Sequence, residues 1–175
     1  FSRKAKGNEP SPMADYYLKL GKILELKETS VLSKENDLDY LSTRVSVSQD
    51  NEVCLSNAKF LVELIERKGL TGCNPTSLPI SKDMLKLVSH EAELGQFLDS
   101  TGKGEYQADI GSLNWIAQLY CPLIAPTVSW LAKRSSAPTI SGPAMVKQAV
   151  RWLSGNIDMC LKTQGGNQEG IKFYC

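Results

Sequence analysis

Four cationic side chains are the strongest candidates for chemistry in this sequence. Lys147 and Arg151 stand four residues apart and would share one face of a helix, while Lys133 and Arg134 close the helical pattern before them. If the four converge, they could hold a nucleic-acid backbone through salt-sensitive contacts that carry no sequence information. The alternative is a solvated surface, with two cations near a helix C-terminus where the helix dipole favours them. The net charge of +1 favours neither a nucleic acid nor an anionic membrane as partner.

Three tryptophans form the second group of candidates. Trp115, Trp130 and Trp152 occur once in each of three predicted helices. They could stack on bases, but one aromatic on each of three packed helices is more typical of core or interface anchors. We therefore predict a packing role for them.

No set of residues in the sequence forms a recognisable catalytic site. His90 is the only histidine and lies beside Glu91 and Glu93, but no serine or cysteine motif accompanies it. Lys103 stands between two glycines, yet the phosphate-binding pattern G-x-x-x-x-G-K-[ST] is absent. We therefore predict a protein that is not an enzyme and uses no cofactor.

The cysteines argue against a metal site or a disulfide framework. They are odd in number, include no C-x-x-C pair, and share the chain with a single histidine: Cys54, Cys73, Cys121, Cys160 and Cys175. This pattern predicts reduced, mostly buried thiols in an intracellular, reducing compartment. Pro122 and Pro126 interrupt the most apolar region, so no membrane span is expected.

The first half of the chain mixes helical and strand patterns. Residues 1–12 are polar with two prolines and predict an extended arm, and 13–27 carry apolar residues near helical spacing. Residues 40–55 alternate on either side of a polar turn at 49–51, which predicts a β-hairpin.

A second helix should follow the hairpin directly. Ser56 is the predicted N-cap and Gly69 the glycine that ends the helix. The glycine and prolines of 71–79 predict an irregular connection, residues 84–88 fit a short helix, and 99–104 suggest a flexible loop.

The clearest helical pattern begins at residue 106. Apolar residues recur there at steps of four and three, in the order Tyr106, Ile110, Leu113, Ala117, Tyr120. Pro122 must end this helix, Pro126 suits the first turn of the next, and Ser141 and Gly155 bracket a third. Residues 157–162 and 171–175 are typical of short strands around a turn.

These elements predict an α+β protein that is mainly α. It would consist of an arm (1–12), a helix with a β-hairpin (13–55), a helical domain (56–156) and a C-terminal strand pair (157–175). The last strand, ending at Cys175, is expected to continue or to dock against a partner.

Several motifs in order resemble the reverse transcriptase of copia-type LTR retrotransposons. The segments are LSNAKFLVELIERKGLTGCNPTSLPI (55–80), YQADIGSLNWIAQLYCPLIAPTVSWLAKRSSAPT (106–139) and AVRWLSGNIDMCL (149–161). They are similar to the family patterns L-S-Q-x-x-Y-x-x-x-L-L, Y-x-x-x-V-G-S-L-x-Y-L-x-x-x-T-R-P-D-I-A and R-Y-L-x-G-T. The likeness spans about residues 14–161.

The resemblance implies a position within the polymerase. The hairpin corresponds to the end of the palm, residues 56–155 to a helical, thumb-like bundle with its connection, and 171–175 to the start of an RNase H-like domain. The family's Y-V-D-D aspartates belong upstream of 13–27, and this sequence holds no such pair. Metal-dependent nucleotidyl transfer requires paired carboxylates, so polymerisation by this chain alone is not expected.

One departure from the family pattern separates two functional hypotheses. Where the family has T-R-P-D-I-A, residues 120–125 read YCPLIA, so that a cation and a carboxylate are replaced by apolar groups. This favours a non-catalytic, retroelement-derived module that serves as a structural or accessory subunit and binds other protein chains. The alternative is a thumb and connection fragment that clamps a template–primer duplex.

Overall fold

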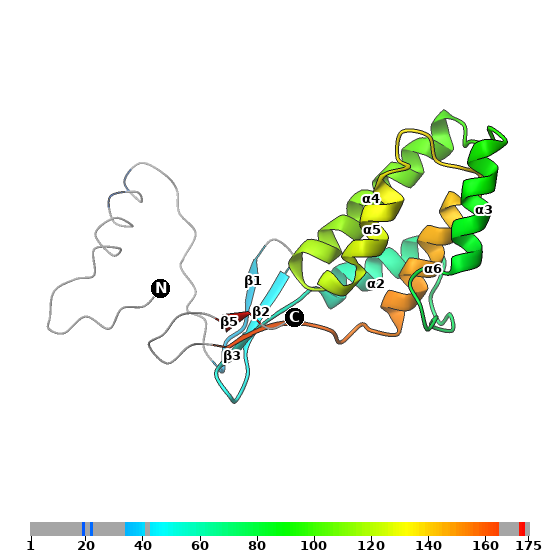
Figure 1. Ribbon diagram of the computed structural model, residues 1–175. Coiled ribbons are helices and arrows are strands. Elements are labelled where there is room, and N and C mark those ends of the chain that lie inside the picture. The colour runs from blue at the N-terminus through cyan, green and yellow to red at the C-terminus, as the bar shows by residue number, and fades with distance from the viewer. Residues whose placement is uncertain (1–18, 20–21, 23–33, 41–42, 165–171, 174–175) are drawn as a thin grey trace, which may run out of the picture. The chain divides into compact units, whose positions relative to one another are not determined.

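The computed structural model describes Lys19, Lys22 and residues 34–40, 43–164 and 172–173 (Figure 1). The arm at 1–12 lies outside the described residues, as does the helix at 13–27 apart from two positions. The chain divides into two units, 1–31 and 32–175, and the sheet and the helical bundle belong to the second. These elements confirm an α+β protein that is mainly α.

Five antiparallel strands form one sheet in the order β1-β2-β3-β4-β5. Their bounds are β1 Leu38–Tyr40, β2 Thr43–Val47, β3 Glu52–Ser56, β4 Leu161–Gln164 and β5 Lys172–Phe173. The hairpin is confirmed as β2 and β3, and Asn51 in its turn has a φ of 61°, which asparagine tolerates better than most residues.

The C-terminal strands extend the sheet that the hairpin begins. The strand predicted at 157–162 lies later, at β4, and it pairs with β3 along Leu55 and Leu161 as well as with β5. Residues far apart in sequence therefore share one sheet. The predicted strand pair at 157–175 does not stand apart from the hairpin.

The helix after the hairpin, α2 (Ala58–Arg67), begins one residue later than predicted. Asn57 is the N-cap, and its side chain accepts the Phe60 N–H at 3.2 Å. Ser56 is still paired with Arg44 in the sheet, so Ser56 cannot cap the helix. Gly69 ends it as predicted, with a φ of 65° and the paired backbone hydrogen bonds of a Schellman motif.

The predicted loop at 99–104 is wrong, because these residues begin the longest of the described helices. The short helix expected at 84–88 is α3 (Lys82–Glu93), capped by Ser81, and α4 (Ser100–Leu119) follows. Asp99 caps α4 by accepting the Gly102 N–H at 2.8 Å. A good cap and the packing of the rest of the helix outweigh the poor helix propensity of two glycines.

The last helices follow the predicted stop signals. Pro122 begins the 3-10 turn η1 (Pro122–Ile124), which leads into α5 (Ala125–Ala132) with Pro126 in its first turn, and α6 is Gly142–Ser154. Ser141 stands before α6 as expected, but its side chain makes no capping hydrogen bond.

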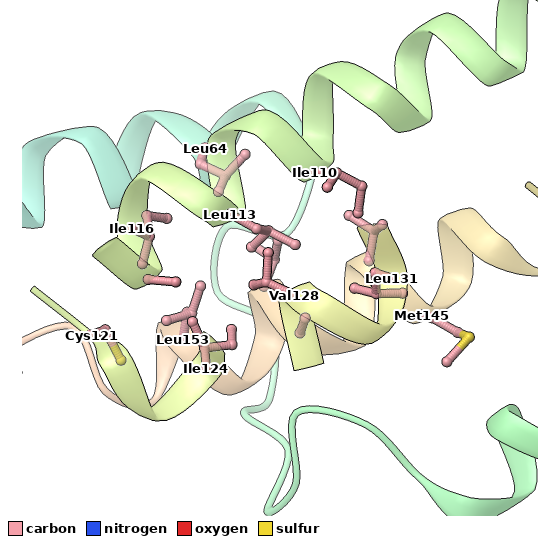
Figure 2. Close-up of a cluster of buried hydrophobic side chains, with 14 of the residues drawn as sticks. Leu64, Ile110, Leu113, Ile116, Cys121, Ile124, Val128, Leu131, Met145 and Leu153 are labelled. Atoms are coloured by element: carbon pink, nitrogen blue, oxygen red, sulfur yellow. The ribbon is translucent and has the colours of Figure 1, made fainter. Parts of the chain in front are cut away.

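The core lies between the helices. Side chains from α2, α4, α5 and α6 converge on it, and Figure 2 shows Leu113 of α4 beside Val128 of α5. Leu61, Leu113, Leu131 and Leu153 each have an exposed fraction of 0%. The apolar stripe predicted on α4 is buried along its length, from Tyr106 through Tyr120.

Two glycines should respond to alanine in opposite ways. A Cβ at Gly155 would lie 2.7 Å from the Pro75 ring, whereas one at Gly111, exposed on α4, would meet nothing within 4 Å. We expect Gly155→Ala to lower the free energy of unfolding by about 1–3 kcal/mol through this clash. Gly111→Ala should raise it by about 0.5–1 kcal/mol through helix propensity. Urea unfolding measures both, and equal effects would contradict the packing described.

Candidate functional site

Arg151, a predicted nucleic-acid contact, binds the chain itself. From α6 its Nε and Nη2 donate hydrogen bonds to the backbone carbonyl oxygen of Asn74, at 2.9 and 2.7 Å. Gln148 Nε2 donates to the Leu78 carbonyl at 3.0 Å, and the Thr76 hydroxyl donates to the Gln148 carbonyl at 3.3 Å. This face of α6 therefore holds the irregular connection at 71–79.

Arg134 also has an internal partner. Its guanidinium carbon lies 3.9 Å from the centroid of the Trp130 ring, the geometry of a cation–π interaction. The turn after α5 is held further by Gln107 of α4, whose Nε2 donates to the Ser135 carbonyl at 2.8 Å. Arg134 thus stabilises the end of α5.

Lys133 and Lys147 are the exposed members of the predicted group. Lys133 lies at one end of an open groove of about 590 Å³ between α4 and α5, which also contains Asn114, Gln118 and Ser129. Among the contacts of the described residues, none joins Lys133, Arg134, Lys147 and Arg151 to one another. Their convergence on one phosphate-binding surface stays a prediction.

The three tryptophans differ in their surroundings. Trp130 and Trp152 are partly buried and pack against the core. Trp115 lies on the outer side of α4 with an exposed fraction of 38%. It does not fill the core, and it remains a candidate for an interface.

Glu91 is a buried carboxylate that its position in the sequence did not single out. It lies on α3 with an exposed fraction of 4%, and accepts hydrogen bonds from the N–H of Ser141, at 3.0 Å, and from its hydroxyl. Burial raises the pKa of this carboxyl. Hydrogen bonding to Ser141, together with the nearby Thr139 and His90, lowers the pKa by more than burial raises it. The net pKa is below its ordinary value of 4.5.

The contact between Glu91 and Ser141 lies next to two connections that pair with each other. Leu98 donates its N–H to the Pro138 carbonyl at 2.8 Å, and Phe97 forms a β-bridge with Thr139. The α3–α4 and α5–α6 connections are therefore paired with each other. Glu91 fixes the start of α6, which follows the second connection. The sequence did contain an indication that Glu91 is buried, because Met84, Val88 and Glu91 recur at steps of four and three on the apolar face of α3.

A second buried charge is neutralised inside the bundle. Asp109 of α4 is 6% exposed and forms an ion pair with Lys68, the C-cap of α2. The sequence placed Asp109 beside the apolar stripe but gave no indication of its partner. The pair links α2 to α4 where a lone carboxylate would be costly to bury.

Two buried tyrosines have different hydroxyl environments. The Tyr106 hydroxyl donates to the Leu131 carbonyl at 2.9 Å, and burial raises its pKa to about 12 although Arg134 opposes the shift. Burial also raises the pKa of Tyr120, whose hydroxyl has no hydrogen-bond partner within the described structure. Neither tyrosine is set up to lose a proton near neutral pH.

The residues considered for catalysis or metal binding do not form a described cluster of three or more possible metal ligands. His90 is exposed, with Nδ1 4.0 Å from a Glu93 carboxylate oxygen, and Lys103 lies in the first turn of α4. The described cysteines carry free thiols, and Cys175 lies outside the described residues. Within the ranges that the structure covers, no three His, Cys, Asp or Glu side chains gather as a metal site. No described helix is long and apolar enough to cross a membrane.

Comparisons with known proteins add no family to this description. No protein-family model matches the chain, and no curated protein and no solved structure gives a significant match. The described residues form a helical domain with a five-stranded sheet, in which the charged side chains of Arg151, Glu91 and Asp109 make internal contacts.

Removing the Arg151 side chain should weaken the fold. Arg151→Ala deletes both hydrogen bonds to Asn74, so we expect the free energy of unfolding to fall by about 1 kcal/mol. The matched control is Lys147→Ala, the exposed cation one turn earlier on α6, which should change stability by less than about 0.5 kcal/mol. Urea unfolding compares the two. Equal losses would contradict a structural role specific to Arg151.

Glu91 should make stability depend on pH. Because the pKa of Glu91 is lowered in the folded state, its ionised form contributes its full stabilisation at neutral pH. This contribution declines as the pH falls below the ordinary pKa of 4.5, and it is lost as the pH falls through the lowered pKa. Glu91→Gln should cost about 1–3 kcal/mol at neutral pH. The difference from wild type should shrink on acidification.

Glu93→Gln is the control for Glu91→Gln. Its side chain lies on the same helix with an exposed fraction of 79%. Chemical unfolding at neutral and acidic pH should show little change for this variant at either condition. A Glu91→Gln defect that is independent of pH would contradict the role of the charge.

Proposed function

We propose that the chain is a non-catalytic, retroelement-derived module that acts as a structural or accessory subunit of a larger protein assembly. The observation that carries the proposal is the contact between Arg151 and the Asn74 carbonyl. Arg151, one of the four cations expected to contact phosphate, holds two parts of its own chain together. Arg134, stacked on Trp130, supports the same conclusion.

The segment that departs from the polymerase pattern supports this origin. In YCPLIA (120–125), Cys121 stands where the family has arginine and is 2% exposed, and Leu123 stands where the family has aspartate and is 59% exposed. An arginine at position 121 would place a charge in the apolar core, where an unpaired charge is strongly destabilising. The present residues therefore suit a module that has kept its packing and given up a charged pair.

The exposed apolar side chains favour a protein partner. Leu94, Phe97 and Ile140 are 58%, 44% and 52% exposed, and they lie on the two connections that the bridge from Phe97 to Thr139 joins. Trp115 adds an exposed aromatic on α4. Aromatic and aliphatic groups of this kind are typical of the centres of protein interfaces, and the near-balanced charge places no barrier to such contacts.

The second candidate function is a clamp for a template–primer duplex. One observation favours it: the groove between α4 and α5 brings Lys133 together with the amides of Asn114 and Gln118. Such groups can contact phosphates without reading sequence. Lys147 is also exposed and free to contribute from α6.

Duplex binding distinguishes the two functions. An RNA–DNA hybrid would be titrated with the wild-type chain and with Lys133→Glu/Lys147→Glu, over a series of salt concentrations. We expect no saturable binding, or weak binding that the double variant leaves unchanged. Arg151 is left intact because its loss would disturb the fold.

The control for this titration is Lys59→Glu/Lys86→Glu. Both lysines are exposed, on α2 and α3, and the change in net charge is the same. Saturable binding with a steep salt dependence, lost in the first double variant and kept in the control, would overturn the structural-subunit proposal in favour of the clamp.

A further inference from the structure

Two cysteines from distant parts of the chain meet on one face of the sheet. In the β3–β4 pair, Cys54 lies directly opposite Lys162, and Cys160 precedes Lys162 by two residues. Because side chains alternate between the faces of a sheet, Cys54, Lys162 and Cys160 point to the same side. The cysteines are therefore diagonal neighbours across adjacent strands.

The Cys160 thiol is close enough to affect the pKa of Cys54. Burial is the largest cause that raises the pKa of Cys54, and proximity and hydrogen bonding to the Cys160 thiol raise it further. Lys162 opposes this shift, while its Nζ also lies 3.3 Å from a Glu52 carboxylate oxygen. Both cysteines are partly accessible, so small reagents can reach them.

The other described thiols have different neighbours. Cys73 lies 3.6 Å from the Ser154 hydroxyl, and Cys121 is buried 3.9 Å from the Met159 sulfur. Neither has a thiol partner among the residues that the structure describes. The juxtaposition of Cys54 and Cys160 is thus a specific feature of the β3–β4 pairing.

We propose that Cys54 and Cys160 form a redox-reversible dithiol site, which a peroxide oxidises to a disulfide linking β3 to β4. The thiolate of one cysteine attacks a peroxide oxygen, giving a sulfenic acid and, with hydrogen peroxide, one water. The second thiol attacks the sulfenic sulfur and releases a second water. Two thiols lose two electrons and two protons, and one hydrogen peroxide becomes two waters.

The geometry of the paired strands determines how far the two cysteines must move to form the disulfide. Diagonal side chains have Cβ atoms up to about 7–8 Å apart, whereas a disulfide needs about 3.5–4.5 Å. Cys160 immediately precedes β4, so it can approach Cys54 without breaking the pairs from Leu161 to Gln164. Closure therefore needs a shift of the chain before β4 and leaves the ladder in place.

The test oxidises the wild-type chain with hydrogen peroxide and maps its peptides without reduction. We expect a cross-linked pair of peptides that carry Cys54 and Cys160 and that a thiol reductant separates. The oxidised chain should also melt at a higher temperature, because a bond closing a loop of roughly 100 residues restricts the unfolded state. This experiment needs no variant, so a folding defect cannot obscure it.

Two variants test which cysteines form the cross-link. Cys54→Ser should abolish the cross-link and leave Cys160 singly oxidised, and Cys73→Ser/Cys121→Ser/Cys175→Ser should keep the cross-link. Cross-links that involve Cys73, Cys121 or Cys175 at the expense of the proposed pair would overturn the proposal. So would oxidation of Cys54 and Cys160 to separate sulfinic acids with no disulfide between them.

Discussion

Burial of one long helix is the constraint on which the bundle depends. The apolar stripe of α4 faces the core, α5 and η1 pack along it, and α6 packs against both α4 and α5 (Figures 1 and 2). A Cβ at Gly142, at the start of α6, would lie 3.1 Å from the Tyr106 ring, which is tighter than most Cβ contacts. The close approach of these helices leaves little space for side chains that do not fit.

Three contacts of charged side chains hold this framework together. Glu91 fixes the start of α6, the Lys68–Asp109 pair joins α2 to α4, and Arg151 holds the connection beside α6. Each contact joins segments that are distant in sequence. Polar groups of this kind contribute to the choice of one packing arrangement, because any alternative arrangement would leave a buried charge or carbonyl without its partner.

Features set by local chemistry could be predicted from the sequence. The hairpin around Asn51, the end of α2 at Gly69 and the effect of Pro122 and Pro126 all depend on neighbouring residues. The start of α4 was missed because two glycines obscured the Asp99 cap. Site contacts could not be foreseen for a different reason. The partner of Arg151 is 77 residues away, and only the packing of α6 brings it near.

The pairing of β3 with β4 has a consequence for how the chain folds. Leu55 and Leu161 are neighbours in the sheet but are separated by the whole helical bundle, so this contact closes a loop of roughly 100 residues at a considerable cost in chain entropy. The β2–β3 hairpin and the individual helices need only local contacts, which form faster. Assembly of the bundle would bring the ends of this loop together, so we expect the sheet to be completed last.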